Sequence, residues 1–299
     1  MRWTYKNLTA VQVQVNRINA RKSMLLWYTG DEPDGQSDNL NATKITYDLI
    51  KATDPWHPVS LCLNCYNFYY EEYSSGADII LSDVYPIAVN TSFSVQYDTV
   101  CNTTYGCCGC DDCKGEFEDV SERLDLFSRY QEILGLGPKT LWGVPQAFGN
   151  ETFWSRYPTP GEEAVMAMLS INHAAKGIVA WDYPTTPAIA SVTSQLAKVV
   201  TVAPVSGFLL GSSPTKSLSV KGQSRIDASA WIVDAQMLVS IVNLDYLDTG
   251  ANVSITLPAA VASLSSTAWG QGNWSFGGET LYKVGLSSLE VDLLIFDLA

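Results

Sequence analysis

Three carboxylates are crowded into one short stretch near the start of the chain: Asp31, Glu32 and Asp34. They directly follow the apolar run of residues 24–29, and the proline and glycine among them prevent a strand from continuing. The acids are therefore expected at the C-terminal end of a strand, which is the catalytic face of a parallel α/β barrel. Carboxylates in unlike environments suit general acid–base chemistry, because one can hold a proton while another stays charged.

The motif around these acids reads apolar-Trp-x-x-Gly-Asp-Glu-Pro over residues 26–33. It resembles the fourth strand of clan A glycoside hydrolases, where the Glu is the general acid/base. The resemblance implies that role for Glu32, with Asp31 in the place where the family usually has Asn. A simpler interpretation is a strand-to-helix turn whose acids are merely solvated.

A glycosidase of this kind also needs negative charge near the anomeric carbon. In clan A the nucleophile is a Glu at the end of the seventh strand, but the matching stretch here, 140–146, ends in Gln146. An amide cannot attack carbon, which leaves Asp83 and Asp182 as candidates; an Asp at a strand end can also cap the next helix. We predict that Glu32 faces one of these two aspartates, with Gln146 as a hydrogen-bonding contact.

A second mechanism uses the Asp31–Glu32 pair alone. Hexosaminidase-like enzymes also place adjacent Asp and Glu at the end of the fourth strand, and there the substrate's acetamide is the nucleophile. Polar and aromatic side chains at strand ends are expected to bind the sugar; they are Asp31, Asp34, Tyr85, Gln146, Trp181 and Tyr183.

Strand-like and helix-like segments alternate up to about residue 202, which indicates a parallel α/β fold. The predicted strands are 24–29, 59–64, 78–83, 140–145 and 177–181; the predicted helices lie within 7–19, 45–54, 66–73, 120–134, 162–175 and 188–202. By the resemblance these are strands four to eight of a TIM-type barrel. The residues before Met24 hold at most one helix, so we expect a partial barrel with open sheet edges, as the C-terminal part of a longer protein.

The pattern changes after about residue 204 to short strands separated by Gly, Asn and Pro turns. This predicts a small antiparallel β-sandwich. Its strands are expected at 230–233, 237–243, 253–257, 280–284 and 291–296. We therefore predict a barrel domain over 1–212 and a β-sandwich domain over 213–299.

Composition excludes several classes of protein. The 299 residues include 18 basic and 31 acidic side chains, for a net charge of -13. Nucleic acids and anionic membranes bind basic patches, so neither is expected as a partner. No apolar run approaches the 20 residues of a membrane span. An oligo- or polysaccharide is the expected partner, and no metal or cofactor is expected.

Glycosylation motifs and cysteines indicate secretion. Acceptor asparagines occur at Asn7, Asn41, Asn90, Asn102, Asn150, Asn252 and Asn273. The seven cysteines are Cys62, Cys65, Cys101, Cys107, Cys108, Cys110 and Cys113. The crowded cysteine loop could bind zinc, but no histidine accompanies it, and an oxidising compartment favours disulfides. One cysteine of seven must stay unpaired within the chain. The sequence shows no signal peptide, so its true start is expected upstream.

Together these features resemble a group of secreted fungal glycosidase-like proteins. The predicted function is hydrolysis of an extracellular or cell-wall glycan with Glu32 as general acid/base. The alternative is a catalytically inactive saccharide-binding or cell-wall protein on the same scaffold, which the missing seventh-strand Glu favours.

Overall fold

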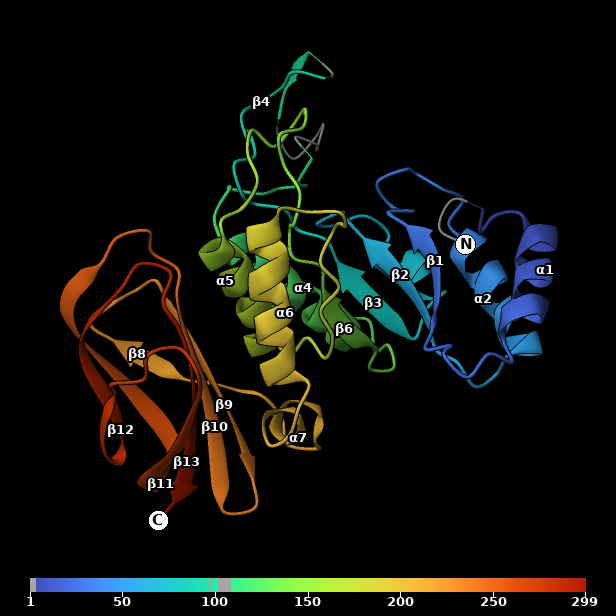
Figure 1. The fold of residues 1–299 in the computed structure, drawn as a ribbon. Helices are drawn as coiled ribbons and strands as arrows, with labels where there is room; N and C mark the ends of the chain where they lie inside the picture. Colours follow the sequence, from blue (N-terminus) through green and yellow to red (C-terminus); the bar gives the residue numbers. More distant parts are fainter. Residues whose placement is uncertain (1–3, 97, 102–108) are drawn as a thin grey trace.

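The structure is a computed structural model that describes residues 4–96, 98–101 and 109–299. A parallel sheet and its helices form the first part of the chain, and an antiparallel β unit forms the rest (Figure 1). The first part comprises α1 (Leu8–Ile18), β1 (Trp27–Asp31), α2 (Ala42–Thr53), β2 (Val59–Leu63), α3 (Tyr70–Ser74), β3 (Ile79–Ser82), a hairpin of β4 (Phe93–Ser94) and β5 (Thr99–Val100), α4 (Glu118–Ile133), β6 (Thr140–Gly143), α5 (Pro160–Asn172), α6 (Pro187–Val200) and α7 (Val205–Leu210).

The parallel sheet has the order β1-β2-β3-β6 and does not close into a barrel within the described residues. A fifth strand was expected at 177–181, but this segment is extended without forming a continuous strand. It contacts β6 through two isolated parallel bridges, Gly143 with Ile178 and Gln146 with Trp181. Gly177 approaches the Trp142 ring so closely that a Cβ there would lie 2.4 Å from it. The segment can therefore follow β6 only with glycine at this point.

Helices cover one face of this sheet and form the larger core. Leu61, Ile80 and Leu141 of the sheet pack with Leu124 of α4 and Met168 of α5, all buried. Alternate residues of the same strands, including Cys62 and Leu81, point to the opposite, inner face. This inner face is where a barrel would enclose its interior, and it ends in the acidic loops of the site.

The β unit comprises β7 (Lys216–Ser217), β8 (Ser219–Lys221), β9 (Ile226–Val233), β10 (Gln236–Asn243), β11 (Thr249–Trp269), β12 (Ser275–Leu286) and β13 (Val291–Leu298). Its two layers share the long strand β11. The first part of β11 pairs with β12 and β8, and its last part pairs with β13, which continues through β10 and β9 to β7. The register shifts between Thr256 and Val261, on either side of Pro258, where the strand passes between layers.

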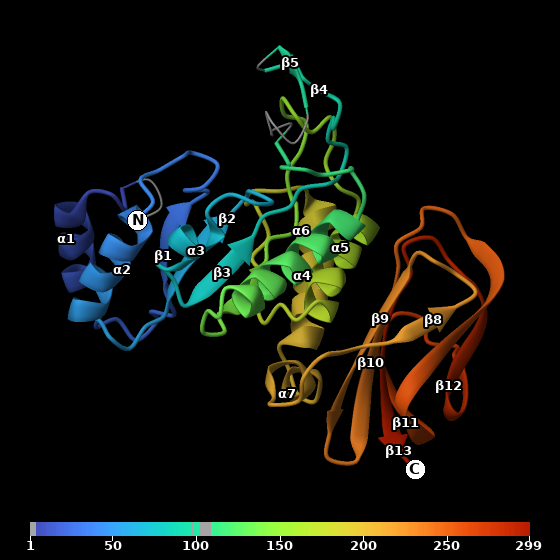
Figure 2. The same cartoon turned by 180° about the vertical axis from the view of Figure 1, so that it is seen from behind.

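The β unit lies on the far side of α5 and α6 from the parallel sheet, as both views show (Figures 1 and 2). Trp231, Leu238 and Leu293 of the β unit belong to the same buried core as α5. The core thus crosses the expected boundary near residue 212, so the two units share apolar packing as well as a chain connection. The described residues contain no helix long and apolar enough to span a membrane.

A histidine between two aspartates also ties the units together. His173 follows α5, and its Nδ1 lies 2.8 Å from Asp125 of α4 while its Nε2 lies 3.0 Å from Asp227 of β9. Burial alone lowers the pKa of His173, but the hydrogen bonds to the two aspartates outweigh it and raise the pKa to about 9. Because only the imidazolium can donate from both nitrogens, the charged form holds the interface.

We expect this interface to weaken with alkali. A histidine whose pKa is raised on folding stabilises fully below its unfolded value near 6.5, and the contribution disappears as pH rises to about 9. The free energy of unfolding should fall across this window by on the order of 2 kcal/mol. This is less than the pKa shift alone implies, because the side chain of Asp125 is largely exposed and water screens its charge. Urea denaturation at pH 6 and pH 9.5 measures it. His173→Gln should remove most of the difference; an unchanged pH dependence would contradict the assignment.

Candidate active site

Glu32 stands at the C-terminal edge of the sheet because β1 ends immediately before it. Glu32 adopts a positive φ of 47°, which is sparsely populated for a non-glycine residue, and Pro33 follows. Its backbone N–H donates to the carbonyl of Cys62 at 3.1 Å, so β1 stays paired with β2 up to the turn. The side chain is half-buried, and its Oε1 accepts from Asn64 Nδ2 at 3.3 Å.

The strand register brings Asp83 to the same point. Asp31 pairs with Cys62 across β1 and β2, and Leu63 pairs with Ser82 across β2 and β3. Glu32 directly follows β1, Asn64 directly follows β2 and Asp83 directly follows β3. These three side chains therefore lie at neighbouring strand ends. The carboxyl groups of Asp83 and Glu32 are hydrogen-bonded to each other.

Asp83 and Glu32 have unlike environments. Asp83 is only 3% exposed, and its Oδ1 receives no hydrogen bond from the described chain. Burial raises the pKa of Asp83 well above its ordinary value, and the charge of Glu32 and the hydrogen bond to it act in the same direction. Two carboxyl groups in direct contact repel each other when both are charged, which favours a proton shared between them. Glu32 is the member that reaches the surface.

The surroundings of the pair are acidic and aromatic. The charges of Asp31 and Asp34 further raise the pKa of Asp83. The hydroxyl of Tyr28 donates to Asp31 Oδ1 from the inner face. Burial, then the neighbouring Asp83, also raises the pKa of Tyr85. Both phenols therefore stay protonated at neutral pH, and Tyr28 uses its proton in the hydrogen bond to Asp31.

Asp34 has a structural role that differs from the expected contact with sugar. It is buried, and its carboxylate accepts from the backbone N–H groups of Gly35 at 2.9 Å, Asn64 at 3.3 Å and Cys65 at 2.8 Å. Those bonds join the loop after β1 to the loop after β2. Asp34 therefore fixes the two loops that carry Glu32 and Asn64, and its oxygens are occupied.

Gln146 is a loop brace. It is fully buried, its Oε1 accepts from Ile87 N at 3.0 Å, and its Nε2 donates to the carbonyls of Ile87 and Phe148 at 3.2 Å each. All of its hydrogen-bonding capacity toward the chain is thereby used. The expectation that Gln146 contacts substrate does not fit this burial.

The structure does not bring Asp182 to the Glu32–Asp83 pair. Asp182 follows the 177–181 segment, which lies beyond β6, whereas Glu32 follows β1 at the opposite end of the strand order. In an open sheet these ends stay apart. Of the two aspartates proposed to face Glu32, only Asp83 shares its position.

The aromatic residues expected to bind sugar divide by exposure. Tyr85 is buried, edge-on to Phe148 with ring centroids 4.9 Å apart, and its carbonyl accepts from Trp154 Nε1. Trp181 is half-buried against the same inner-face cluster. Tyr183 is 87% exposed. Only the last two present a ring surface on which a saccharide can stack.

One disulfide lies beside the site. Cys110 and Cys113 are bonded, and Cys101 is also in a disulfide, while Cys107 and Cys108 lie outside the described residues. Cys62 contradicts the disulfide prediction: it is a buried thiol facing inward from β2, beneath the acids. Its neighbour in sequence, Cys65, follows the strand end and does not pair with it. Among the described residues no cluster of three His, Cys, Asp or Glu side chains is arranged to hold a metal ion.

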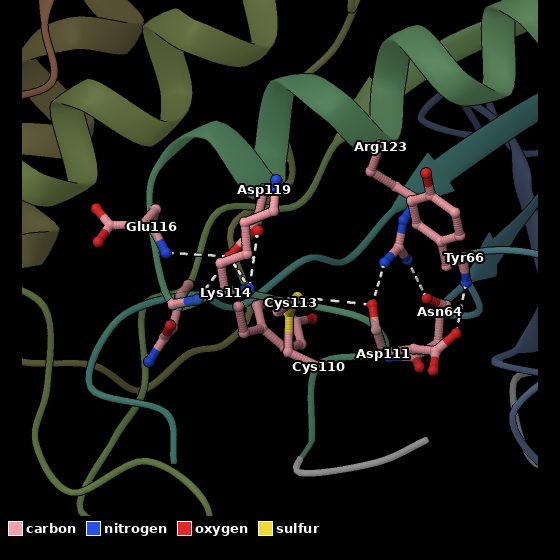
Figure 3. Close-up of a disulfide and its surroundings, with 12 residues drawn as sticks. Asn64, Tyr66, Cys110, Asp111, Cys113, Lys114, Glu116, Asp119 and Arg123 are labelled. Atoms are coloured by element: carbon pink, nitrogen blue, oxygen red, sulfur yellow. Dashed lines mark hydrogen bonds between the residues drawn. A yellow bond between two sulfur atoms is a disulfide. The ribbon is translucent and has the colours of Figure 1, made fainter. Parts of the chain in front are cut away.

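Arg123 of α4 connects this disulfide loop to Asn64 at the end of β2 (Figure 3). Its guanidinium donates to the carbonyls of Asn64 and Asp111, and Asp111 lies between the two bonded cysteines. The side chain of Asp111 in turn accepts from Tyr66 N at 2.6 Å, and the Tyr66 ring lies 5.5 Å from the guanidinium. The disulfide loop, the end of β2 and α4 are thus joined around one buried charge.

The sequence analysis missed Asn64 and Arg123. Asn64 could have been found, because it is a polar residue directly after a strand, like the acids after β1 and β3. Arg123 had no such signal, since it lies within a helix and its role depends on the cysteine loop.

Glycosylation at the acceptor motifs stays a prediction. The asparagines at 7, 41, 90, 150, 252 and 273 are exposed, and Asn102 lies outside the described residues.

No family model matches the sequence, and no curated protein matches it. Solved structures do resemble the fold. A debranching enzyme from Nostoc punctiforme is 14% identical with a TM-score of 0.57, over 96% of this chain and 60% of its own. A maltogenic alpha-amylase from Thermotoga neapolitana is 10% identical with a TM-score of 0.54, over 98% and 65%. Alpha-galactosidase I from Mortierella vinacea is 14% identical with a TM-score of 0.54, over 90% and 67%. The chain spans less than two thirds of the first two, and its α/β fold resembles the folds of these three proteins.

Proposed function

We propose that this protein is a glycoside hydrolase that acts on an extracellular or cell-wall glycan, with Glu32 as general acid/base. The observation that supports it most is the hydrogen-bonded Glu32–Asp83 pair at the C-terminal edge of the parallel sheet. Glycosidases need one protonated and one charged carboxyl group at this edge. The pair supplies one proton, and Glu32 presents it at the surface.

Asp83 serves in this proposal as the proton partner of Glu32. It is too deeply buried to touch an anomeric carbon, and its contact with Glu32 is closer than the roughly 6.5–9.5 Å that an inverting enzyme leaves for water. Glu32 donates its proton to the leaving oxygen as the glycosidic bond breaks. That proton is the one Glu32 shares with Asp83, and the water that later completes hydrolysis returns it to the pair.

The negative charge at the anomeric carbon must then come from another group. Asp31 is half-buried beside Glu32 and is oriented by Tyr28. It fits two roles: direct attack, or support of a substrate acetamide whose carbonyl oxygen bonds to the anomeric carbon. Water later opens that bond and returns a proton to Glu32.

Paired aryl hexosides that carry either a hydroxyl or an acetamido group at carbon 2 distinguish the two roles of Asp31. Only the role in which Asp31 supports the acetamide requires the acetamido group.

A glycan panel tests the function itself. Release of reducing ends from neutral oligo- and polysaccharides is measured in parallel with binding by calorimetry. The proposal expects cleavage of at least one glycan that binds. Binding without cleavage across the panel would instead establish the inactive saccharide-binding protein that the absent seventh-strand Glu suggests.

Secretion supports an extracellular substrate. Six exposed acceptor asparagines and the disulfides fit an oxidising compartment. A mass shift after treatment with an N-glycosidase, on protein from a eukaryotic secretory host, checks this part. The fungal affiliation stays a prediction from the resemblance.

A further inference from the structure

A cavity of about 250 Å³ lies on the helical side of the sheet, away from the edge that carries Glu32. It is enclosed by α5, α6, α7 and the 175–180 segment, and its lining is largely aliphatic. Lining residues used below are Glu163, Ala167, Lys176, Thr193, Ala197 and Leu210. Ala197 and Leu210 are exposed and form its rim, so a molecule of up to about ten heavy atoms could enter.

Glu163 gives this cavity a polar group that the fold does not need. It is 1% exposed, and its Oε1 accepts one hydrogen bond, from Thr193 at 3.3 Å across α5 and α6. Its Oε2 is buried with no donor from the described chain. Leaving a buried carboxyl oxygen unsatisfied is costly, so a partner that is not part of the chain is expected.

The preceding residue shows how this fold treats a buried glutamate with a structural role. Glu162 is equally buried, but it accepts from both guanidinium nitrogens of Arg156 at 2.7 and 2.8 Å, from Thr159 N and from the hydroxyl of Tyr246. Those partners lower the pKa of Glu162 despite its burial. Glu163 has none of them, and burial raises its pKa to about 7. Thus Glu162 has hydrogen-bond donors for both of its carboxylate oxygens, whereas Glu163 has one donor, for Oε1 only.

The nearest basic lining residue does not neutralise Glu163. Lys176 donates its Nζ to the carbonyl of Leu209 at 2.8 Å, and it forms no ion pair with Glu163. A cationic donor would convert Glu163 to a charge-assisted pair, and the protein's net charge of -13 favours approach of cations. The aliphatic lining excludes a strongly hydrated cation and favours one carried on an apolar body.

We infer that the cavity between α5, α6 and α7 binds a small apolar primary amine, with Glu163 as the acceptor of its ammonium group. This site is separate from the proposed sugar site and does not depend on it. Its ligand class is defined by an aliphatic part that fills the cavity and one ammonium that donates to Oε2.

Matched six-carbon probes test the inference on the full chain: n-hexylamine, n-hexanol and sodium hexanoate. Binding is measured by calorimetry and by the rise in melting temperature. Hexylamine in several-fold excess over its Kd should raise the melting temperature by roughly 2–4 °C, hexanol less, and hexanoate not at all. Glu163→Gln should weaken hexylamine about tenfold or more while leaving hexanol within about twofold. Glu132→Gln, an exposed glutamate of α4, is the matched control and should change neither.

Filling the cavity provides a second, independent test. Ala167→Leu should abolish binding of both hexylamine and hexanol; if that variant does not fold, Ala197→Leu at the rim replaces it. Equal affinity of hexylamine for wild type and Glu163→Gln would overturn the inference. The inference would also be overturned if no probe bound wild type and the Leu variant that fills the cavity were more stable than wild type. The cavity would then be a packing defect and not a binding site.

Discussion

Glu32→Gln is expected to lower kcat on the cleaved glycan by about 10²–10⁴-fold while leaving glycan binding nearly unchanged. The amide keeps the shape of Glu32 and can still contact Asn64 and Asp83, but it cannot give up a proton. Steady-state rates and calorimetric binding on the same glycan separate the two effects. Glu71→Gln, an exposed glutamate of α3, is the matched control and should retain full activity. Equal activity of Glu32→Gln and wild type would refute the assignment of Glu32.

Asp83→Asn completes this prediction because it should separate activity from stability. A carboxyl group whose pKa is raised on folding stabilises below its unfolded pKa, near 4, and loses that contribution as pH rises. At neutral pH wild type therefore carries the cost of a buried acid, which asparagine does not. We expect Asp83→Asn to melt higher than wild type at pH 7 and to be less active. A lower melting temperature with unchanged activity would make Asp83 a structural residue only.

Much of the parallel sheet could be predicted, because its determinants are local. Strands β1, β2 and β3 end directly before Glu32, Asn64 and Asp83, and in the sequence they are visible as apolar runs that stop at polar or turn residues. The prediction of a continuous strand after Gly177 was wrong. It rested on the apolar character of the segment, whereas the course of the backbone there depends on close packing of Gly177 against the Trp142 ring. Five of the seven strands of the β unit were predicted, but β7 and β8 were not, and β11 is much longer than predicted. The length of β11 depends on tertiary pairing, because it pairs with β12 along its first part and with β13 along its last part.

The site was predictable only where position along a strand determined it. Glu32 and Asp83 meet because the register of β1, β2 and β3 places the ends of these strands within one residue of each other. Gln146 and Asp34 have the same kind of position, but in the structure their side chains hydrogen-bond neighbouring loops. Burial distinguishes the two roles, and burial is a property of the whole fold. Closure of the sheet is likewise a property of the whole fold, and within the described residues the parallel sheet is open.

Arg123→Met is expected to cost roughly 2–5 kcal/mol of unfolding free energy, because it leaves the buried carbonyl of Asn64 and the half-buried carbonyl of Asp111 without their donor. Methionine fills similar space, so the loss reports hydrogen bonds rather than a cavity. Arg123→Lys should recover little, since one ammonium cannot span two carbonyls as the planar guanidinium does. Urea denaturation measures the change, and Arg129→Met, exposed on the same helix, should stay within about 0.5 kcal/mol of wild type.

Reduction of the disulfide shows whether Arg123 acts through the loop of Cys110 and Cys113. Among the described residues, Arg123 hydrogen-bonds that loop through the carbonyl of Asp111, so the substitution and the reduction should remove part of the same interaction. Their costs together should then be less than their sum by at least about 0.5 kcal/mol, the threshold for coupled neighbours. Because Asn64 contacts Glu32, both changes should also reduce kcat. Strictly additive costs would mean that the loop and the end of β2 are held independently, and that Arg123 does not connect them.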